Sequence, residues 1–194
     1  QRDKATCRKL FGLPEDAFIV LSVGTNQFRK RHDLTMRAFK MLADKRPDAR
    51  LVMHCQGTGM QGWDLQQMAR YVGIADKLFL VHSMNIDWSE DELVSLYNTA
   101  DVQINTAGGE GWGLTSVEGA ACGVPQLVPD WSATREIWNG FGMLLPVADF
   151  RMEPKYLNTI HANIDVQAAA DALMLMAEDE ARRSAVGDLC KSRA

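Results

Sequence analysis

The sequence Gly108-Gly-Glu-Gly-Trp-Gly-Leu-Thr-Ser-Val-Glu-Gly-Ala-Ala-Cys-Gly-Val-Pro125 decides the fold of this 194-residue chain. The apolar segment 100–106 before it predicts a buried strand, and 125–129 after it predicts another. Leu114–Cys122 has room for about two helical turns, and Gly123 stands where a left-handed helix end favours glycine. The unit is therefore a strand, a glycine-rich turn, a helix and a second strand.

The glycine-rich turn predicts a site for an anion. Gly108, Gly109 and Gly111 let the backbone turn tightly and let a ligand approach closely. Gly113 leads into the helix, whose first N–H groups have no partner within the helix and carry partial positive charge. Such a helix start most naturally binds a phosphate group.

Two glutamates flank this anion site, Glu110 just before the helix and Glu118 inside it. Carboxylates accept hydroxyls well, so the pair suggests a sugar on each side of a phosphate. The run Glu110-Gly-Trp-Gly-Leu, followed by Glu118-Gly-Ala-Ala-Cys-Gly-Val-Pro, resembles the signature of the retaining GT-B glycosyltransferases of family four. That family has roughly Glu-Gly-Phe-Gly-Leu and Glu-Ala-Met-Ala-Cys-Gly-Thr-Pro, so Trp112 and Gly119 are mild departures.

Composition excludes several classes of protein. A formal net charge of -4, without a basic stripe interleaved with aromatics, disfavours nucleic acid as a partner. No apolar run approaches the length of a membrane span, and no signal peptide is visible. The cysteines at 7, 55, 122 and 190 form no C-x-x-C pair, which predicts buried or free thiols in a reducing, cytoplasmic compartment and no zinc site.

Strand and helix signals alternate along the chain, which indicates an α/β fold. Strands are expected at 18–23, 51–55, 78–81, 100–106, 125–129 and 143–147. Helices are expected at 2–11, around 34–42, at 64–71, at 89–99 after a Ser-x-x-Glu capping box, at 114–122 and at 133–138. Residues 1–194 thus form one Rossmann-like domain, a three-layer α/β/α with about six parallel strands, and 150–194 form its helical tail.

Ligands of such sheets bind outside the carboxyl ends of the strands, so the loops after strands are the candidates for chemistry. These loops are 24–31, 56–63, 82–88, 107–113 and 129–132.

The first of these loops holds three cations, Arg29, Lys30 and Arg31, which suit a diphosphate. The family pattern here is Val-Gly-Arg, four residues and Lys-Gly, with the arginine and lysine clamping the diphosphate. Aligned on Gly24, Lys30 takes the lysine position, whereas Thr25 takes the arginine position. Arg29 or Arg31 could supply the charge that is missing at Thr25.

Two other loops carry weaker signals. Gly57–Gly62 satisfies G-x-G-x-x-G, but it follows the second strand rather than the first, and no acid follows the next strand to hold a ribose. The resemblance implies that His82, Ser83 and Met84 contact the nucleotide base. Trp131 could cover the ligand or simply pack.

The resemblance implies that the chain is the C-terminal, donor-binding half of a GT-B glycosyltransferase, which moves a sugar from a UDP- or GDP-linked donor with retention. Glu110 would hold donor-sugar hydroxyls, and Glu118 would hold the ribose. Lys30, an arginine and the helix start would stabilise the leaving diphosphate. Catalytic residues are then Glu110 and Lys30, and the donor site comprises Gly24, Arg29, Lys30, Arg31, His82, Ser83, Met84, Gly111, Trp112, Gly113, Leu114, Thr115 and Glu118.

No cofactor or metal ion is expected beyond the nucleotide sugar, since no cluster has metal-ligand spacing. The expected partner is an N-terminal acceptor-binding domain outside this sequence, and any membrane-surface contact would be made through that half. Two alternatives stay open: a nicotinamide-dependent dehydrogenase built on Gly57–Gly62 and a non-catalytic nucleotide-binding module. A third, a glycoside hydrolase using Glu110 and Glu118, is poorer. The hydrolase explains neither the cations nor the phosphate turn.

Overall fold

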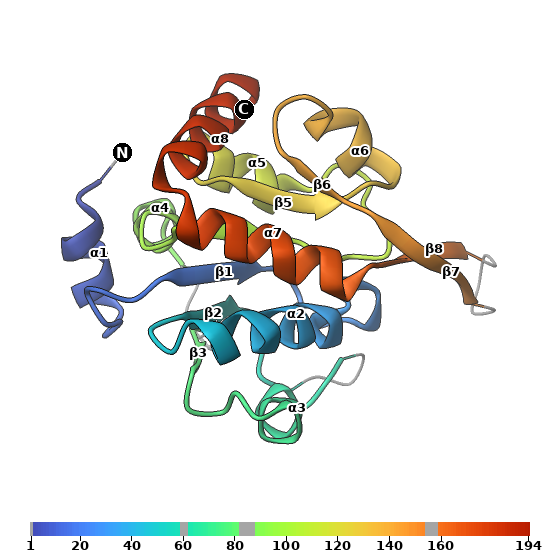
Figure 1. Cartoon of the computed structure of the whole chain (residues 1–194), viewed down its shortest axis with the longest axis horizontal. Helices are drawn as coiled ribbons and strands as arrows, with labels where there is room; N and C mark the ends of the chain where they lie inside the picture. The colour runs from blue at the N-terminus through green and yellow to red at the C-terminus, as the bar shows by residue number, and fades with distance from the viewer. Residues whose placement is uncertain (1, 59–61, 82–87, 154–158) are drawn as a thin grey trace.

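A computed structural model describes residues 2–58, 62–81, 88–153 and 159–194, and its centre is a six-stranded parallel sheet (Figure 1). The strand order is β3-β2-β1-β4-β5-β6, and every neighbouring pair in the sheet is parallel. The strands are β1 (Ile19–Val23), β2 (Arg50–His54), β3 (Leu78–Leu80), β4 (Val102–Ile104), β5 (Gln126–Pro129) and β6 (Met143–Leu145). The predicted Rossmann-like α/β fold is confirmed.

Helices cover both faces of the sheet because its strands alternate buried side chains between two cores. Val20 of β1 joins the core under α2, α3 and α7, whereas Ile19 and Leu21 join the core under α4. Figure 1 shows α2 and α7 side by side on the face toward the viewer. The helices are α1 (Lys4–Leu10), α2 (His32–Lys45), α3 (Leu65–Val72), α4 (Glu90–Tyr97), α5 (Leu114–Ala121), α6 (Ser132–Trp138), α7 (Val166–Glu178) and α8 (Glu180–Arg193).

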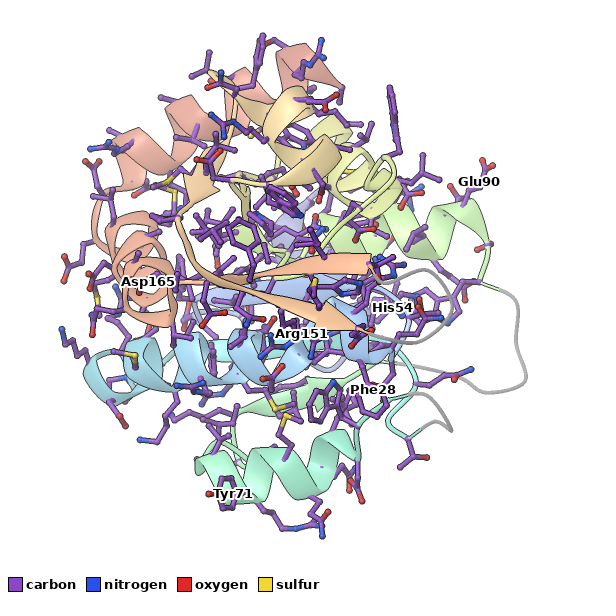
Figure 2. All side chains as sticks on the ribbon, turned by 90° about the vertical axis from the view of Figure 1, so that its right-hand side faces the viewer. Phe28, His54, Tyr71, Glu90, Arg151 and Asp165 are labelled. Atoms are coloured by element: carbon purple, nitrogen blue, oxygen red, sulfur yellow. The ribbon has the colours of Figure 1, made fainter. Side chains whose placement is uncertain are left out.

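The strand order reverses between β1 and β4, which are neighbours in the sheet but distant in the chain. At such a switch point the loops after the two strands diverge and leave a crevice at the carboxyl edge. The loop after β1 carries Lys30, and the loop after β4 carries Glu110. Figure 2 turns this side of the molecule toward the viewer and labels His54 at the end of β2, Phe28 in the loop after β1 and Arg151 on the neighbouring hairpin.

The signals at the helix ends behave as the sequence predicts. Gly113 and Gly123 have φ angles of 83° and 82°, in the left-handed region that favours glycine. Ser89 and Glu92 form the predicted capping box at the start of α4. Gly109 and Gly111 are different, because neither has a positive φ and added Cβ atoms would meet nothing within 4 Å. The left-handed backbone of the glycine-rich turn is therefore confined to Gly113.

A two-stranded hairpin, which the sequence analysis did not predict, replaces the start of the expected helical tail. β7 (Val147–Glu153) pairs antiparallel with β8 (Thr159–Ile164), and helix begins only at Val166. The prediction of helix from residue 150 is therefore wrong for residues 150–153 and 159–164. Alternation signals this hairpin, because Phe150 and Met152 stand on one face while Arg151 and Glu153 stand on the other.

Gly119 on α5 has a steric reason to lack a side chain. An added Cβ would overlap the amide oxygen of Gln103 and approach Gln126 Nε2 to 2.9 Å. Both glutamines are buried, and Gln126 Nε2 donates to Gln103 Oε1 at 3.2 Å. Gln103 Nε2 in turn donates to the Thr115 carbonyl at 2.9 Å, which ties the first turn of α5 to β4. The departure from the family's alanine thus accommodates this buried amide pair.

We predict that Gly119→Ala lowers the free energy of unfolding by about 2 kcal/mol, because the new methyl group overpacks a buried, hydrogen-bonded site. The measurement is urea unfolding of the parent and the variant. Gly111→Ala is the matched control, since its Cβ enters open space, and its change should stay within about 0.5 kcal/mol. Equal stabilities of Gly119→Ala and Gly111→Ala would contradict the packing account.

Candidate functional site

Three charged side chains meet at the switch point of the sheet. Lys30 Nζ lies 2.5 Å from Glu110 Oε1, and an Arg29 guanidinium nitrogen lies 2.9 Å from Glu110 Oε2. The same arginine nitrogen donates to the Gly109 carbonyl at 3.0 Å. Asn105, at the end of β4, contacts Glu110 Oε1 at 3.4 Å. One carboxylate therefore holds both cations of the β1 loop; we call Arg29, Lys30 and Glu110 the ion cluster.

The ion cluster is only partly open to solvent. The side chains of Glu110 and Lys30 are 7% and 12% exposed, whereas that of Arg29 is 37% exposed. Burial by itself would raise the pKa of the Glu110 carboxyl, but the hydrogen bonds and charges of Lys30 and Arg29 outweigh it and lower that pKa below its ordinary value. Glu110 is therefore ionised at neutral pH. Two cations facing one carboxylate leave the ion cluster with one excess positive charge.

Three separate elements hold the loop that carries Glu110. Gly108 N–H donates to the Arg29 carbonyl at 2.8 Å, and the Gly108 carbonyl accepts from Ala162 N–H of β8 at 2.9 Å. A Cβ at Gly108 would lie 2.8 Å from that of His161, so close packing against β8 requires glycine there. The Glu110 N–H donates to Ser132 Oγ at 3.1 Å. The missed hairpin is thus part of the site's framework.

Ser132 adopts a backbone conformation that serine seldom takes. Its φ angle is 53°, one of two positive values for non-glycine residues among the described residues. Such a residue costs about 1–2 kcal/mol and persists where its surroundings fix it. Here the strained residue is the one that accepts the Glu110 N–H. The strained backbone conformation therefore occurs in a residue that hydrogen-bonds a member of the ion cluster.

The start of α5 is open to a ligand. Gly113 is its N-cap and has no side chain to accept from the first N–H groups of the helix. Trp112 is 58% exposed, and Leu114 is also exposed. Thr115, half-buried, faces a pocket of about 310 Å³. No side chain of the described residues therefore caps the start of α5, and the anion site there stays a prediction.

That pocket lies between the carboxyl ends of β1 and β2 and the helices α4 and α5. Its polar lining comes from both strand ends and from α5, and Leu93 of α4 adds an apolar contact; the lining includes Gly24, Thr25, His54, Gln56, Leu93, Thr115 and Glu118. His54 Nδ1 donates to the Val81 carbonyl at 2.7 Å, and its ring lies 4.3 Å from that of Trp88. Glu118, predicted to hold a ribose, therefore faces a pocket shared with Gly24 and Thr25.

The structure separates the two arginines that could replace the charge missing at Thr25. Arg29 joins the ion cluster, whereas Arg31 turns away from it. Arg31 has a left-handed backbone with φ 52°, pairs with Asp33 at 2.7 Å and hydrogen-bonds Asn163 of the hairpin. Arg31 therefore ties α2 to β8, and its place in the donor site stays a prediction.

The other sequence candidates fall into three groups. His82, Ser83 and Met84 lie outside the described residues. Trp131 packs its ring edge against Phe150 at 4.8 Å between ring centres, which fits the packing alternative. Gly62 of the G-x-G-x-x-G match needs its hydrogen because a Cβ would overlap Asn26, whose amide bonds the carbonyls of Gln56 and Trp63.

Several residues of the site were missed from the sequence. Tyr97 donates its hydroxyl to Glu118 at 2.6 Å, and Asn105 and Ser132 hold Glu110 or its backbone. Asn105 lies near the carboxyl end of the predicted strand 100–106 and directly follows the observed β4, so the sequence does place it close to the carboxyl edge of the sheet. Tyr97 contacts Glu118 and Ser132 contacts the Glu110 N–H only because the fold brings distant segments together. No local pattern in the sequence predicts these contacts.

Comparison with known proteins decides the family. Residues 3–147 match the family described as glycosyl transferases group 1. The chain belongs to this family. It is 32% identical over 130 residues to D-inositol 3-phosphate glycosyltransferase 2 of Catenulispora acidiphila, covering 63% of this chain and 30% of that protein. It is 34% identical over 130 residues to a D-inositol 3-phosphate glycosyltransferase of Geodermatophilus obscurus, covering 63% of this chain and 28% of that one.

Solved structures share the fold. The C-terminal domain of the group 1 glycosyl transferase LpcC of Francisella tularensis matches with a TM-score of 0.75 at 17% identity, covering 100% of this chain and 91% of that one. The Anabaena protein HepE, solved in complex with UDP-glucose, matches with a TM-score of 0.76 at 15% identity, covering 97% and 46%. These likenesses support the GT-B fold assignment, and the dehydrogenase alternative is not favoured.

The chain spans about 30% of the length of the curated relatives that it matches. Among the described residues, no helix is both long and apolar enough to cross a bilayer, and no three metal-ligating side chains gather in one place. The four cysteines are free thiols.

We predict that Glu110→Gln destabilises the fold in a pH-dependent way. Removing the carboxylate leaves the buried Lys30 without its partner, which should cost about 3 kcal/mol near neutral pH. A carboxyl with a lowered pKa stabilises the fold above its unfolded pKa, and that stabilisation is lost as the pH falls through the folded value. The stability gap between parent and variant should therefore narrow below about pH 4.5.

Urea unfolding at about pH 7 and about pH 4 measures this gap. Glu136→Gln is the control, because Glu136 is exposed on α6 outside the ion cluster, and its stability should match that of the parent at both pH values. A Glu110→Gln gap that stays constant between the two pH values would contradict the ion cluster.

Proposed function

We propose that this domain binds a nucleoside diphosphate sugar at the β1/β4 switch point and is the donor-binding half of a retaining glycosyltransferase. One observation carries the proposal: Lys30 and Arg29 converge with Glu110 beside the uncapped start of α5. This arrangement offers two cations and free backbone donors to a diphosphate. A neighbouring carboxylate is available for sugar hydroxyls.

Donor binding would exchange the partners within the ion cluster. Glu110 pairs with both cations, so none of the three charges is without a partner of opposite sign. An incoming diphosphate takes over Lys30 and Arg29, and Glu110 is then released to accept hydroxyls of the donor sugar. The same cations stabilise the negative charge that grows on the diphosphate as the sugar leaves.

The comparisons support a sugar nucleotide as the ligand. HepE has a similar fold and was solved with UDP-glucose, and the curated relatives are named as glycosyltransferases. Retention of configuration is proposed from the resemblance of the segment between Glu110 and Glu118 to retaining enzymes. A cytoplasmic location is proposed from the free cysteines.

We predict that the parent binds UDP or GDP but not NADH, and that Lys30→Ala weakens the nucleotide about tenfold or more, because it removes a charged contact to phosphate. Isothermal titration with UDP, GDP, uridine, guanosine and NADH measures this. The nucleosides lack the diphosphate, so their affinity should not change in Lys30→Ala.

Lys40→Ala is the matched control for the lost lysine, because Lys40 pairs with Asp44 on α2 and lies outside the ion cluster. It should leave nucleotide affinity unchanged. If nucleoside and nucleotide lose affinity equally in Lys30→Ala, the residue acts through the fold and not through phosphate. Tighter binding of NADH than of either diphosphate would refute the proposed function.

We predict that the 194-residue chain binds the donor without transferring its sugar. Holding donor and acceptor together supplies roughly 7–11 kcal/mol of a barrier, and the acceptor-binding half would lie outside this chain. The test is incubation with labelled nucleotide sugars and a panel of glycan and lipid acceptors. Sugar transfer at ordinary enzyme rates would show that this domain is sufficient by itself.

A further inference from the structure

Tyr97 is the last residue of α4, and its ring is 1% exposed. It packs in the core beneath α4 with Ile19, Leu21 and Val124. A capping box closes the start of the same helix. The ring is therefore held by a buried core on a well-terminated helix, and its position is fixed independently of any ligand.

The hydroxyl of Tyr97 lies at the boundary of this core, where it contacts Glu118. It donates to Glu118 Oε2 at 2.6 Å, a short hydrogen bond to a carboxylate. Burial raises the pKa of Tyr97 well above its ordinary value, and the hydrogen bond and charge of Glu118 raise it further. Tyr97 thus keeps its proton and remains a donor across the usable pH range.

Glu118 itself is exposed and lines the pocket with Thr25 and Thr115. Among the described residues, no second group hydrogen-bonds its carboxylate. A glutamate side chain that is free in solvent samples several rotamers, and fixing one of them costs binding free energy. The hydrogen bond from Tyr97 restricts the carboxylate before a ligand arrives.

We infer that Tyr97 is a positioning residue for ribose recognition: it holds Glu118 Oε2 so that the remaining acceptor positions of the carboxylate face the ribose hydroxyls of the nucleotide. This inference rests on the proposed function, since it assigns the ribose to Glu118. Tyr97 does not touch the ligand. Its contribution is specific to nucleotides that carry the hydroxyls, because only those use the carboxylate.

The test compares UDP with 2′-deoxy-UDP, and GDP with 2′-deoxy-GDP, by isothermal titration. The parent should prefer the ribonucleotide by about tenfold, the value expected for a hydrogen bond to a carboxylate. Tyr97→Phe keeps the buried ring and removes only the hydroxyl, and the preference should fall to about two- to threefold. Glu118→Gln should lower the preference similarly, and the double variant should be no worse than Glu118→Gln alone.

Two controls separate positioning from a loss of structure. Tyr71→Phe removes the hydroxyl of a tyrosine that is 93% exposed on α3, and its ribonucleotide preference should equal that of the parent. The preference is also a ratio of two affinities measured on the same preparation, so a reduced folded fraction does not change it. Thermal unfolding of each variant records any change in stability.

Each outcome bears on the inference differently. If Tyr97→Phe weakens both nucleotides equally, or adds its full effect to that of Glu118→Gln, then Tyr97 only packs and the inference is wrong, while the proposed function stands. If the preference is lost in Glu118→Gln but unchanged in Tyr97→Phe, the inference again fails alone. If the parent binds neither UDP nor GDP, the proposed function fails and the inference fails with it.

Discussion

The buried charge of Glu110 is the constraint on which the rest of the site depends. A carboxylate that is 7% exposed is stable only if cations accompany it, and Lys30 and Arg29 supply them from the neighbouring strand's loop. This pairing joins the loops after β1 and β4 across the switch point of the sheet. It also gives a chain of net charge -4 a local excess of one positive charge at this edge of the sheet.

Several hydrogen bonds fix the loop that carries Glu110. β8 binds the Gly108 carbonyl, the β1 loop binds its N–H, and Ser132 at the start of α6 binds the Glu110 N–H. These elements come from different parts of the chain, so the loop is held from several sides. Such support keeps a binding group within a few tenths of an ångström of its working position.

The strands of the sheet could be predicted from the sequence, whereas the directions of several side chains at the site could not. Apolar runs predict all six parallel strands, and Gly113 and Gly123 mark the ends of α5, because these signals are local. Arg29 pairs with Glu110, whereas Arg31 has a left-handed backbone and pairs with Asp33. No local pattern in the sequence requires the left-handed conformation at Arg31, so the direction of these two side chains could not be predicted. The hairpin does have a local signal, the alternation of apolar and charged residues from Phe150 to Glu153.

The two glutamates of the signature are equivalent in sequence but not in their surroundings. Glu110 is buried and its charge is compensated by two cations, whereas Glu118 is exposed and is held by a neutral phenol. A phosphate attracts the charged partners of Glu110, Lys30 and Arg29, and competes with the carboxylate for them. It attracts the neutral hydroxyl of Tyr97, the partner of Glu118, much less. Under the proposed function, a bound diphosphate would therefore rearrange the contacts of Glu110 and leave those of Glu118 in place. Of the two glutamates, which have seven residues between them, Glu110 would exchange its partners on ligand binding and Glu118 would keep Tyr97.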